Sequence, residues 1–125
     1  MKKSSIFLIL ILVSLLINGC KYDFILPEVV PPITTPPTFA TQVVPIFTNA
    51  NKCTACHKTG GEAPDLTAAN AYASIVPGLV NAAAPAQSLI YSFPLATSST
   101  HNWKKYTASE AAIILAWLTD GAKNN

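Results

Sequence analysis

Hydrophobic residues beyond position 38 recur with the spacing of helices, and no run alternates over the length of a β-strand. The last predicted helix has the strongest signals, because Thr107 and Glu110 have capping-box spacing and Gly121 is a typical helix stop. The pattern predicts one small all-α domain with long connecting loops. Its expected helices cover residues 39–50, 67–76, 85–93 and the stretch between Thr107 and Gly121.

Prolines delimit these predicted helices. Pro45 limits the regularity of the first helix, and Pro77 ends the second. Pro85 suits the first turn of the third helix, which Pro94 closes. The side chains expected to face the core are Val43, Val44, Phe47, Tyr72, Ile75, Val76, Ile113, Ile114, Trp117 and Leu118.

A different pattern occupies the N-terminus. Lys2 and Lys3 are followed by residues 6–17, which are apolar apart from Ser14. A signal-peptide core has about 7–15 apolar residues, whereas a bilayer-spanning helix needs roughly 20, so the run predicts a signal peptide. An uncleaved anchor helix is the alternative. Under either interpretation the rest of the chain lies outside the cytoplasm.

The end of this segment, LLINGC, places Gly19 before Cys20 and has no A-x-A-type cleavage site. It resembles the lipobox of bacterial lipoproteins, in which the cysteine is acylated and becomes the mature N-terminus. The resemblance implies that residues 1–19 are a lipoprotein signal peptide and that Cys20 is lipidated. It also implies that the chain is anchored to a membrane of the cell envelope, facing the periplasm or the cell surface.

Residues 20–38 form the next unit, a lipidated cysteine followed by a proline-rich tether. Five of the ten prolines lie between residues 21 and 38. Proline favours extended backbone, so this stretch predicts a semi-rigid spacer ahead of a domain over residues 39–125. The apolar residues of the tether leave a second interpretation open, in which part of it lies along the domain.

The charge of the chain excludes one class of partner. After the signal peptide the lysines balance the six acidic residues, and the chain has no arginine. Because there is no basic stripe, nucleic acid is not an expected partner.

Residues 51–60, NKCTACHKTG, carry the most specific chemical signal. Cys53, Cys56 and His57 form the C-x-x-C-H attachment signature of c-type haem. Two cysteines at this spacing can each form a thioether with one vinyl group of the same porphyrin. The adjacent histidine can then bind the iron as its proximal ligand. The motif therefore predicts one covalently bound haem c.

Three other interpretations of the motif remain open. A thioredoxin-like thiol-redox pair would stand in a βαβ context, and no strand is predicted here. A structural zinc site could use Cys53, Cys56, His57 and His101, although the ligand pairs of such sites are generally separated along the chain. A plain disulfide between the two cysteines is the simplest of the three.

The context of the motif resembles the class I monohaem cytochrome c domains found on bacterial lipoproteins. The resemblance extends over residues 39–125 and is most specific at C-x-x-C-H and at the terminal AWLTDGAKN. It implies a fold of about four short helices wrapped around the haem, in which Phe47 of the first helix lies near Trp117 of the last. It also implies that the backbone carbonyl of Pro64 accepts a hydrogen bond from the proximal imidazole and so fixes its tautomer.

The chain departs from this family at the distal iron ligand, which is usually a methionine in the loop before the last helix. Its one methionine is Met1, within the predicted signal peptide. His101 stands at the matching place and is the only histidine besides His57. We therefore expect His101 to be the distal ligand, with Lys104, Lys105 or an open iron position as the alternatives.

Together these patterns predict a membrane-tethered monohaem c-type cytochrome that carries single electrons at the bacterial cell envelope, with other redox proteins as partners. No acid–base pair or activated nucleophile is evident, so the chain is not expected to be an enzyme. Two other functions remain open. One is a haem domain that binds or senses a small gas through an open sixth position, and the other is a docking module of a larger complex.

Overall fold

The computed structural model describes residues 26, 29–101 and 103–125. Within these residues every regular element is a helix and none is a strand, which confirms the predicted all-α class. The elements are η1 (Phe39–Val43), α2 (Val44–Thr48), η2 (Asn49–Asn51), α3 (Ala71–Ile75), η3 (Pro85–Gln87), α4 (Leu89–Ser92) and α5 (Ala108–Thr119).

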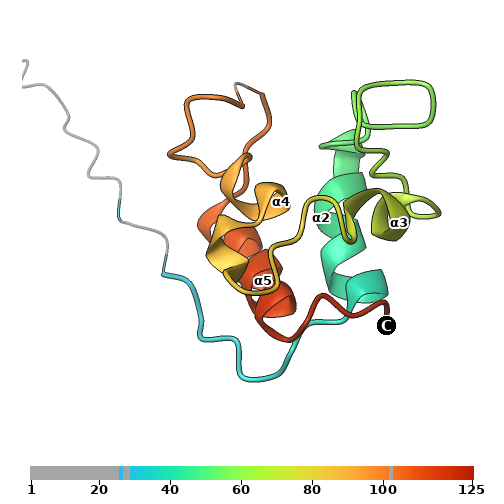
Figure 1. Cartoon of the computed structure of the whole chain (residues 1–125). Helices are drawn as coiled ribbons and strands as arrows, with labels where there is room; N and C mark the ends of the chain where they lie inside the picture. The colour runs from blue at the N-terminus through green and yellow to red at the C-terminus, as the bar shows by residue number, and fades with distance from the viewer. Residues whose placement is uncertain (1–25, 27–28, 102) are drawn as a thin grey trace, which may run out of the picture.

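The helices form two arms, which Figure 1 shows on opposite sides of the molecule. The first arm, residues 44–76, contains α2 and α3, and the second arm, residues 85–119, contains α4 and α5. The chain end returns beside the start of the first arm (Figure 1). The arms are therefore joined at one end by the core and by the C-terminal residues.

The core lies where η1 meets α5. Phe39 packs against Tyr72 and against Trp117, with ring centres 5.2 Å apart in each pair. The N–H of Phe39 donates to Oδ1 of Asn125 at 2.8 Å, so the C-terminus is tied to the same place. Phe47 and Trp117 belong to one buried core. Helices far apart in the sequence are thus packed together by aromatic burial.

The first predicted helix is present, but its winding changes along its length. η1 is a π-helix, in which the N–H of Val44 donates to the carbonyl of Phe39. α2 follows directly, with Pro45 in its first turn. Because Pro45 has no N–H for the helix ladder, the wider turn precedes it. η2 then follows, with Ala50 in left-handed backbone at φ 51°.

The second predicted helix is shorter than expected, since α3 begins at Ala71 and not at residue 67. The residues before it form a turn around the Asp65 carboxylate, which accepts from the N–H and the hydroxyl of Thr67 at 3.0 and 2.6 Å. The same carboxylate accepts from the Thr59 hydroxyl at 2.6 Å and the Asn70 amide at 2.8 Å. Asp65 therefore joins this turn to the loop that follows C-x-x-C-H.

The third predicted helix consists of two pieces, η3 and α4, so the prediction of one helix over 85–93 is wrong. Ser88 separates the pieces, with non-helical backbone at φ −57° and ψ 131°. Its side chain is 1% exposed, and its hydroxyl accepts from the N–H of Asn81 at 2.9 Å. Serine often offers the backbone such an alternative to a helical hydrogen bond.

The last predicted helix is confirmed. The hydroxyl of Thr107 accepts from the N–H of Glu110, and the Glu110 carboxylate accepts from the N–H of Thr107, which completes the capping box. Gly121 follows the helix with φ +93°, a left-handed conformation that favours glycine. Ile114, Trp117 and Leu118 are buried as predicted.

The end of the predicted tether lies along the domain. A groove beside α5 is lined by residues 33–36 on one side and by Ala112, Leu115 and Ala116 on the other. Pro37 is fully buried. The predicted signal peptide over 1–19 and the lipidated Cys20 lie outside the described residues. No helix of the described part of the chain is both long and apolar enough to cross a bilayer.

Candidate functional site

The C-x-x-C-H motif forms a tight turn directly after the first helical segment. The N–H of Cys53 donates to the carbonyl of Phe47 at 2.9 Å, and the N–H of His57 donates to the carbonyl of Cys53 at 2.9 Å. The carbonyl of His57 accepts from the N–H of Leu66 at 3.0 Å. Both ends of the motif are thereby fixed by backbone hydrogen bonds to the first arm.

The loop after the motif approaches it closely at Gly61. A Cβ atom at position 61 would lie 2.3 Å from the carbonyl oxygen of Cys56 and 3.2 Å from that of Lys58. Real Cβ atoms do not come so near to backbone, so this position requires glycine. Gly60 precedes it with φ +76°. The two glycines let the chain reverse beside the cysteines.

His101 lies on the long loop between α4 and α5, in the second arm. Lys105 ties this loop together, because its amine donates to the carbonyls of Ala96 and Ser98. The ring of Phe93 meets the ring of His101 edge-on, with centres 6.0 Å apart. The Phe93 ring thus contacts His101 directly, and Lys105 ties together the loop that carries it.

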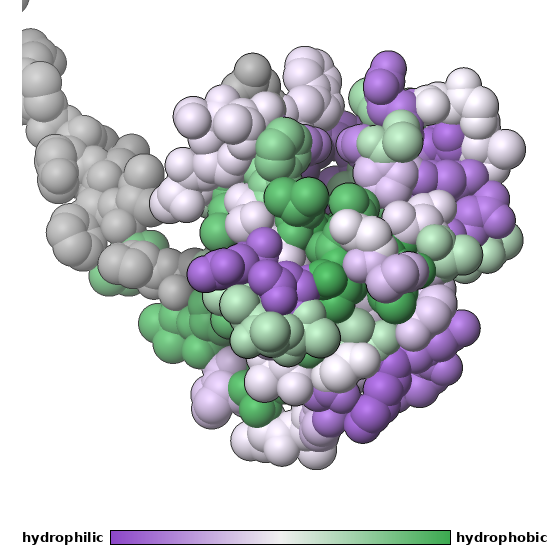
Figure 2. Space-filling model, in the orientation of Figure 1, coloured by the Kyte–Doolittle hydropathy of each residue, from purple (hydrophilic) through white to green (hydrophobic). Residues whose placement is uncertain are grey.

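A cavity of about 250 Å³ separates the two arms. Figure 2 shows hydrophobic side chains gathered in the middle of this face, where the surface is hollowed between the arms. His57 and His101 lie on its two sides, together with Cys53. The other lining residues are Ala63, Pro64, Leu66, Leu79, Leu89, Ile90, Phe93, Pro94, Lys104 and Tyr106.

The two imidazoles face one another across this cavity. The ring centres of His57 and His101 are 6.2 Å apart, and the ring planes are inclined by 19°. Metal–nitrogen bonds are about 2.1 Å long and the ring centre lies roughly 1.1 Å further, so two imidazoles on opposite sides of one metal ion have centres about 6.4 Å apart. The observed separation of the ring centres is close to that value.

Both rings also carry an unused polar atom. Nδ1 of His57 and Nδ1 of His101 are buried, and neither has a hydrogen-bond partner among the described residues. Buried polar groups without a partner are uncommon in proteins and need an explanation. The cavity thus brings two histidines and one cysteine together in apolar surroundings.

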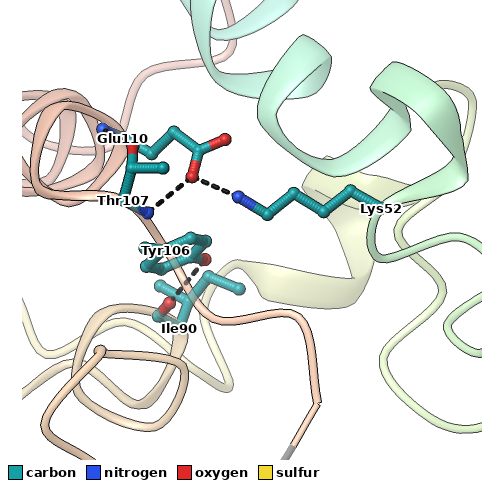
Figure 3. Close-up of polar contacts among 5 residues, drawn as sticks. All are labelled: Lys52, Ile90, Tyr106, Thr107 and Glu110. Carbon is teal, nitrogen blue, oxygen red and sulfur yellow. Dashed lines mark hydrogen bonds and ion pairs between the residues drawn. The ribbon is translucent and has the colours of Figure 1, made fainter. Parts of the chain in front are cut away.

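Figure 3 shows polar contacts around Tyr106, which lines the cavity, and Lys52, which precedes Cys53. Lys52 forms an ion pair with Glu110, which also accepts from the N–H of Thr107 at 2.8 Å. The Tyr106 hydroxyl donates to the carbonyl of Ile90 at 2.9 Å. Burial raises the pKa of the Tyr106 hydroxyl far above its ordinary value, so Tyr106 remains a neutral donor.

The electrostatic surroundings of Cys53 favour the thiol over the thiolate. Burial raises the pKa of Cys53 above its ordinary value, and Glu110 acts in the same direction. The positive charges of Lys52 and Lys104 lower the pKa and oppose this effect. Since burial is the largest cause, Cys53 is protonated at neutral pH.

Not all of the predicted site residues line the cavity. Cys53, His57, Pro64 and His101 line the cavity, whereas Cys56 is exposed and is not among the lining residues. Nδ1 of His57 has no hydrogen-bond partner within the described residues, so it does not donate to the Pro64 carbonyl. Pro64 lines the cavity.

The alternative distal ligands are engaged elsewhere. The amine of Lys104 donates to the carbonyl of Asn51 at 3.0 Å, and Lys105 binds carbonyls of its own loop. Sequence reasoning missed the contribution of Leu89, Ile90 and Phe93 to the cavity wall. Their run of apolar side chains next to Pro94 was the available signal, but the pattern there predicts only a helix.

The rival interpretations of the motif can be compared with this geometry. Cys53 and Cys56 are both free thiols in the described part of the chain. Within residues 26, 29–101 and 103–125, no group of three or more His, Cys, Asp or Glu side chains is close enough to hold a metal ion. The described elements also contain no strand that could supply a βαβ unit.

Comparisons with known proteins add no family. No family model, curated protein or solved structure matches the chain.

Proposed function

We propose that this chain is a membrane-tethered monohaem c-type cytochrome that carries single electrons at the bacterial cell envelope. The observation that carries the proposal is the pair of imidazoles, His57 and His101, whose centres lie 6.2 Å apart across an apolar cavity lined by Cys53. When bound there, haem c would supply an iron that alternates between Fe(III) and Fe(II).

Two cysteines and two histidines would hold the haem, each pair in a different way. The sulfur atoms of Cys53 and Cys56 would be the covalent attachment points, since the C-x-x-C-H spacing suits the two vinyl groups. His57 would bind the iron from the first arm and His101 from the second. The ligands thus come from both arms, and a covalently fixed group would bridge them.

The cavity wall would exclude water and fix the polarity around the iron. Leu66 and Ile90 are buried, with 4% and 5% of their surfaces exposed. Tyr106 turns its hydroxyl toward the Ile90 carbonyl and is 3% exposed. A dry apolar surrounding of this kind is one of the means by which proteins set the potential of a haem.

Retention of haem by the polypeptide tests the proposal. The chain would be produced in a bacterial host able to attach haem c, and extracted with acid acetone. We expect the colour to stay with the protein and the pyridine haemochrome to show a c-type spectrum. Cys53→Ser together with Cys56→Ser should abolish both. Complete loss of colour to the solvent, or stoichiometric zinc in the purified protein, would refute the proposal.

A further inference from the structure

Two lysines cross between the arms next to the cavity. Lys52 immediately precedes Cys53, and its amine is paired with the Glu110 carboxylate of α5. Lys104 stands three residues after His101, and its amine donates to the Asn51 carbonyl at 3.0 Å. Lys52 therefore belongs to the first arm and contacts the second, whereas Lys104 belongs to the second arm and contacts the first.

The Lys52–Glu110 pair is the stronger of these connections. Its side chains are only 21% and 23% exposed, so the pair is partly withdrawn from water and from screening by salt. Glu110 is also held by the N–H of Thr107 at 2.8 Å, which leaves its carboxylate little freedom (Figure 3). Of the two ion pairs in the described part of the chain, this one joins the arms, whereas Lys123–Asp120 lies at the end of α5.

The two lysines connect the arms at a place where the hydrophobic core does not. The arms are held at their base by Phe39 and Trp117. At the cavity, in contrast, the arms are separated by about 250 Å³ of space. Lys104 lines this opening, and Lys52 adjoins Cys53, which lines it as well, so both connections lie beside the cavity.

We propose that Lys52, Glu110 and Lys104 are positioning residues that set the separation of His57 and His101, and thereby how firmly His101 binds the iron. This inference rests on the proposed function. In this proposal neither lysine binds the iron. Both lysines affect the iron ligand His101 only by fixing the distance between the two arms.

Carbon monoxide binding to the reduced holoprotein measures this effect, because carbon monoxide must wait for His101 to leave the iron. Lys52→Met and Glu110→Gln should each raise the rate of carbon monoxide binding about tenfold, because each removes a partly exposed charge-assisted contact between the arms. Gln still satisfies the capping box, so this variant separates the ion pair from the helix cap. Lys104→Met should raise the rate less, since its partner is a neutral carbonyl.

Matched variants separate positioning from general stability. Lys123→Met removes the other ion pair and should leave the rate unchanged. The double variant Lys52→Met with Glu110→Gln should match the single variants, because each removes the same contact. Lys52→Arg should bring the rate back toward that of the wild type. Wild-type rates in both single variants, or a doubled effect in the double variant, would overturn the proposal.

Hydrogen exchange supplies a readout that needs no haem. Lys52→Met should speed exchange at the N–H of Cys53 in one arm and of Tyr106 in the other, and Lys123→Met should not. If the wild-type chain carries no covalent haem, the proposed function is wrong. Hydrogen exchange then tests by itself whether Lys52 fixes the distance between the arms. Unchanged exchange in Lys52→Met would then refute that role as well.

Discussion

At the scale of single residues, the cavity is defined by two histidines with unsatisfied nitrogens. Nδ1 of His57 and Nδ1 of His101 are buried without a partner in the described residues. The two rings face one another across the cavity, and this makes His101 the most informative residue to change.

Replacement of His101 should open the distal side of the iron. In His101→Ala we expect the oxidised holoprotein to change from low-spin to high-spin or water-ligated iron, and the reduced form to bind carbon monoxide readily. His101→Met should raise the reduction potential, because methionine ligation favours the reduced iron. Absorption spectra and redox titration measure these changes.

The control for His101 is Lys105→Ala, which loosens the loop without removing the imidazole. It should preserve a low-spin spectrum. If His101→Ala leaves the spin state, the potential and carbon monoxide binding unchanged, another group or an open position takes the place of His101. A haem domain that binds a small gas would then become the better interpretation.

Asp65 should make part of the stability dependent on pH. Hydrogen bonds from Thr59 and Thr67 lower the pKa of its carboxyl well below the ordinary value of 3.8. A lowered folded-state pKa stabilises the fold fully above the unfolded value, and this contribution is lost as the pH falls below it. The melting temperature of wild type should therefore exceed that of Asp65→Asn at about pH 6, and the difference should shrink toward about pH 3. A difference that is constant with pH would contradict this.

Cys53, His57 and His101, which line the cavity, could be identified from the sequence, and the contacts that position them could not. C-x-x-C-H is a local pattern, and His101 was identified because it is the one spare histidine in the right loop. The ion pair of Lys52 with Glu110 joins residues 58 positions apart. No local pattern encodes such a pair, because it depends on how η1 packs on α5.

At the scale of elements, α5 is the longest helix described, and its start is fixed by side chains. Thr107→Ala removes the hydroxyl that accepts from the Glu110 N–H. Loss of an N-cap of this kind costs about 1 kcal/mol, which lowers the melting temperature of a domain of this size by about 4–8 °C. Thr119→Ala, at the other end of the helix, should change stability by less than about 0.5 kcal/mol. Equal effects of the two variants would show that the cap contributes nothing.

The predicted elements are correct where helix signals agree, and wrong where a side chain offers the backbone another hydrogen bond. Thr107, Glu110 and Gly121 lie within or beside α5, and its predicted limits are correct. Ser88 interrupts a helical pattern by accepting from Asn81, and Asp65 replaces the first turn of α3 with a hydrogen-bonded turn. Both residues favour turns and caps over helix interiors, and the hydrophobic pattern alone does not show which alternative forms.

At the scale of the whole molecule, the predicted lipid anchor on Cys20 would hold the chain at a membrane. Cys20→Ser should release a soluble domain, whereas the wild type should fractionate with membranes after a salt wash. Two or more acyl chains hold a protein stably and one does not. Mass spectrometry of the mature N-terminus should show a lipid on Cys20. An unmodified N-terminus at another residue would contradict the anchor.

The groove that residues 33–36 form with α5 shortens the reach of such an anchor. Residues 21–32 would span about 37 Å at about 3.1 Å per residue, compared with roughly 55 Å for the whole stretch to residue 38. A lipid on Cys20 would therefore confine the domain to a thin layer above the bilayer. A second protein anchored in the same membrane would meet the domain within that layer. The length of the tether would then set their effective concentration, independently of the protein concentration in the surrounding compartment.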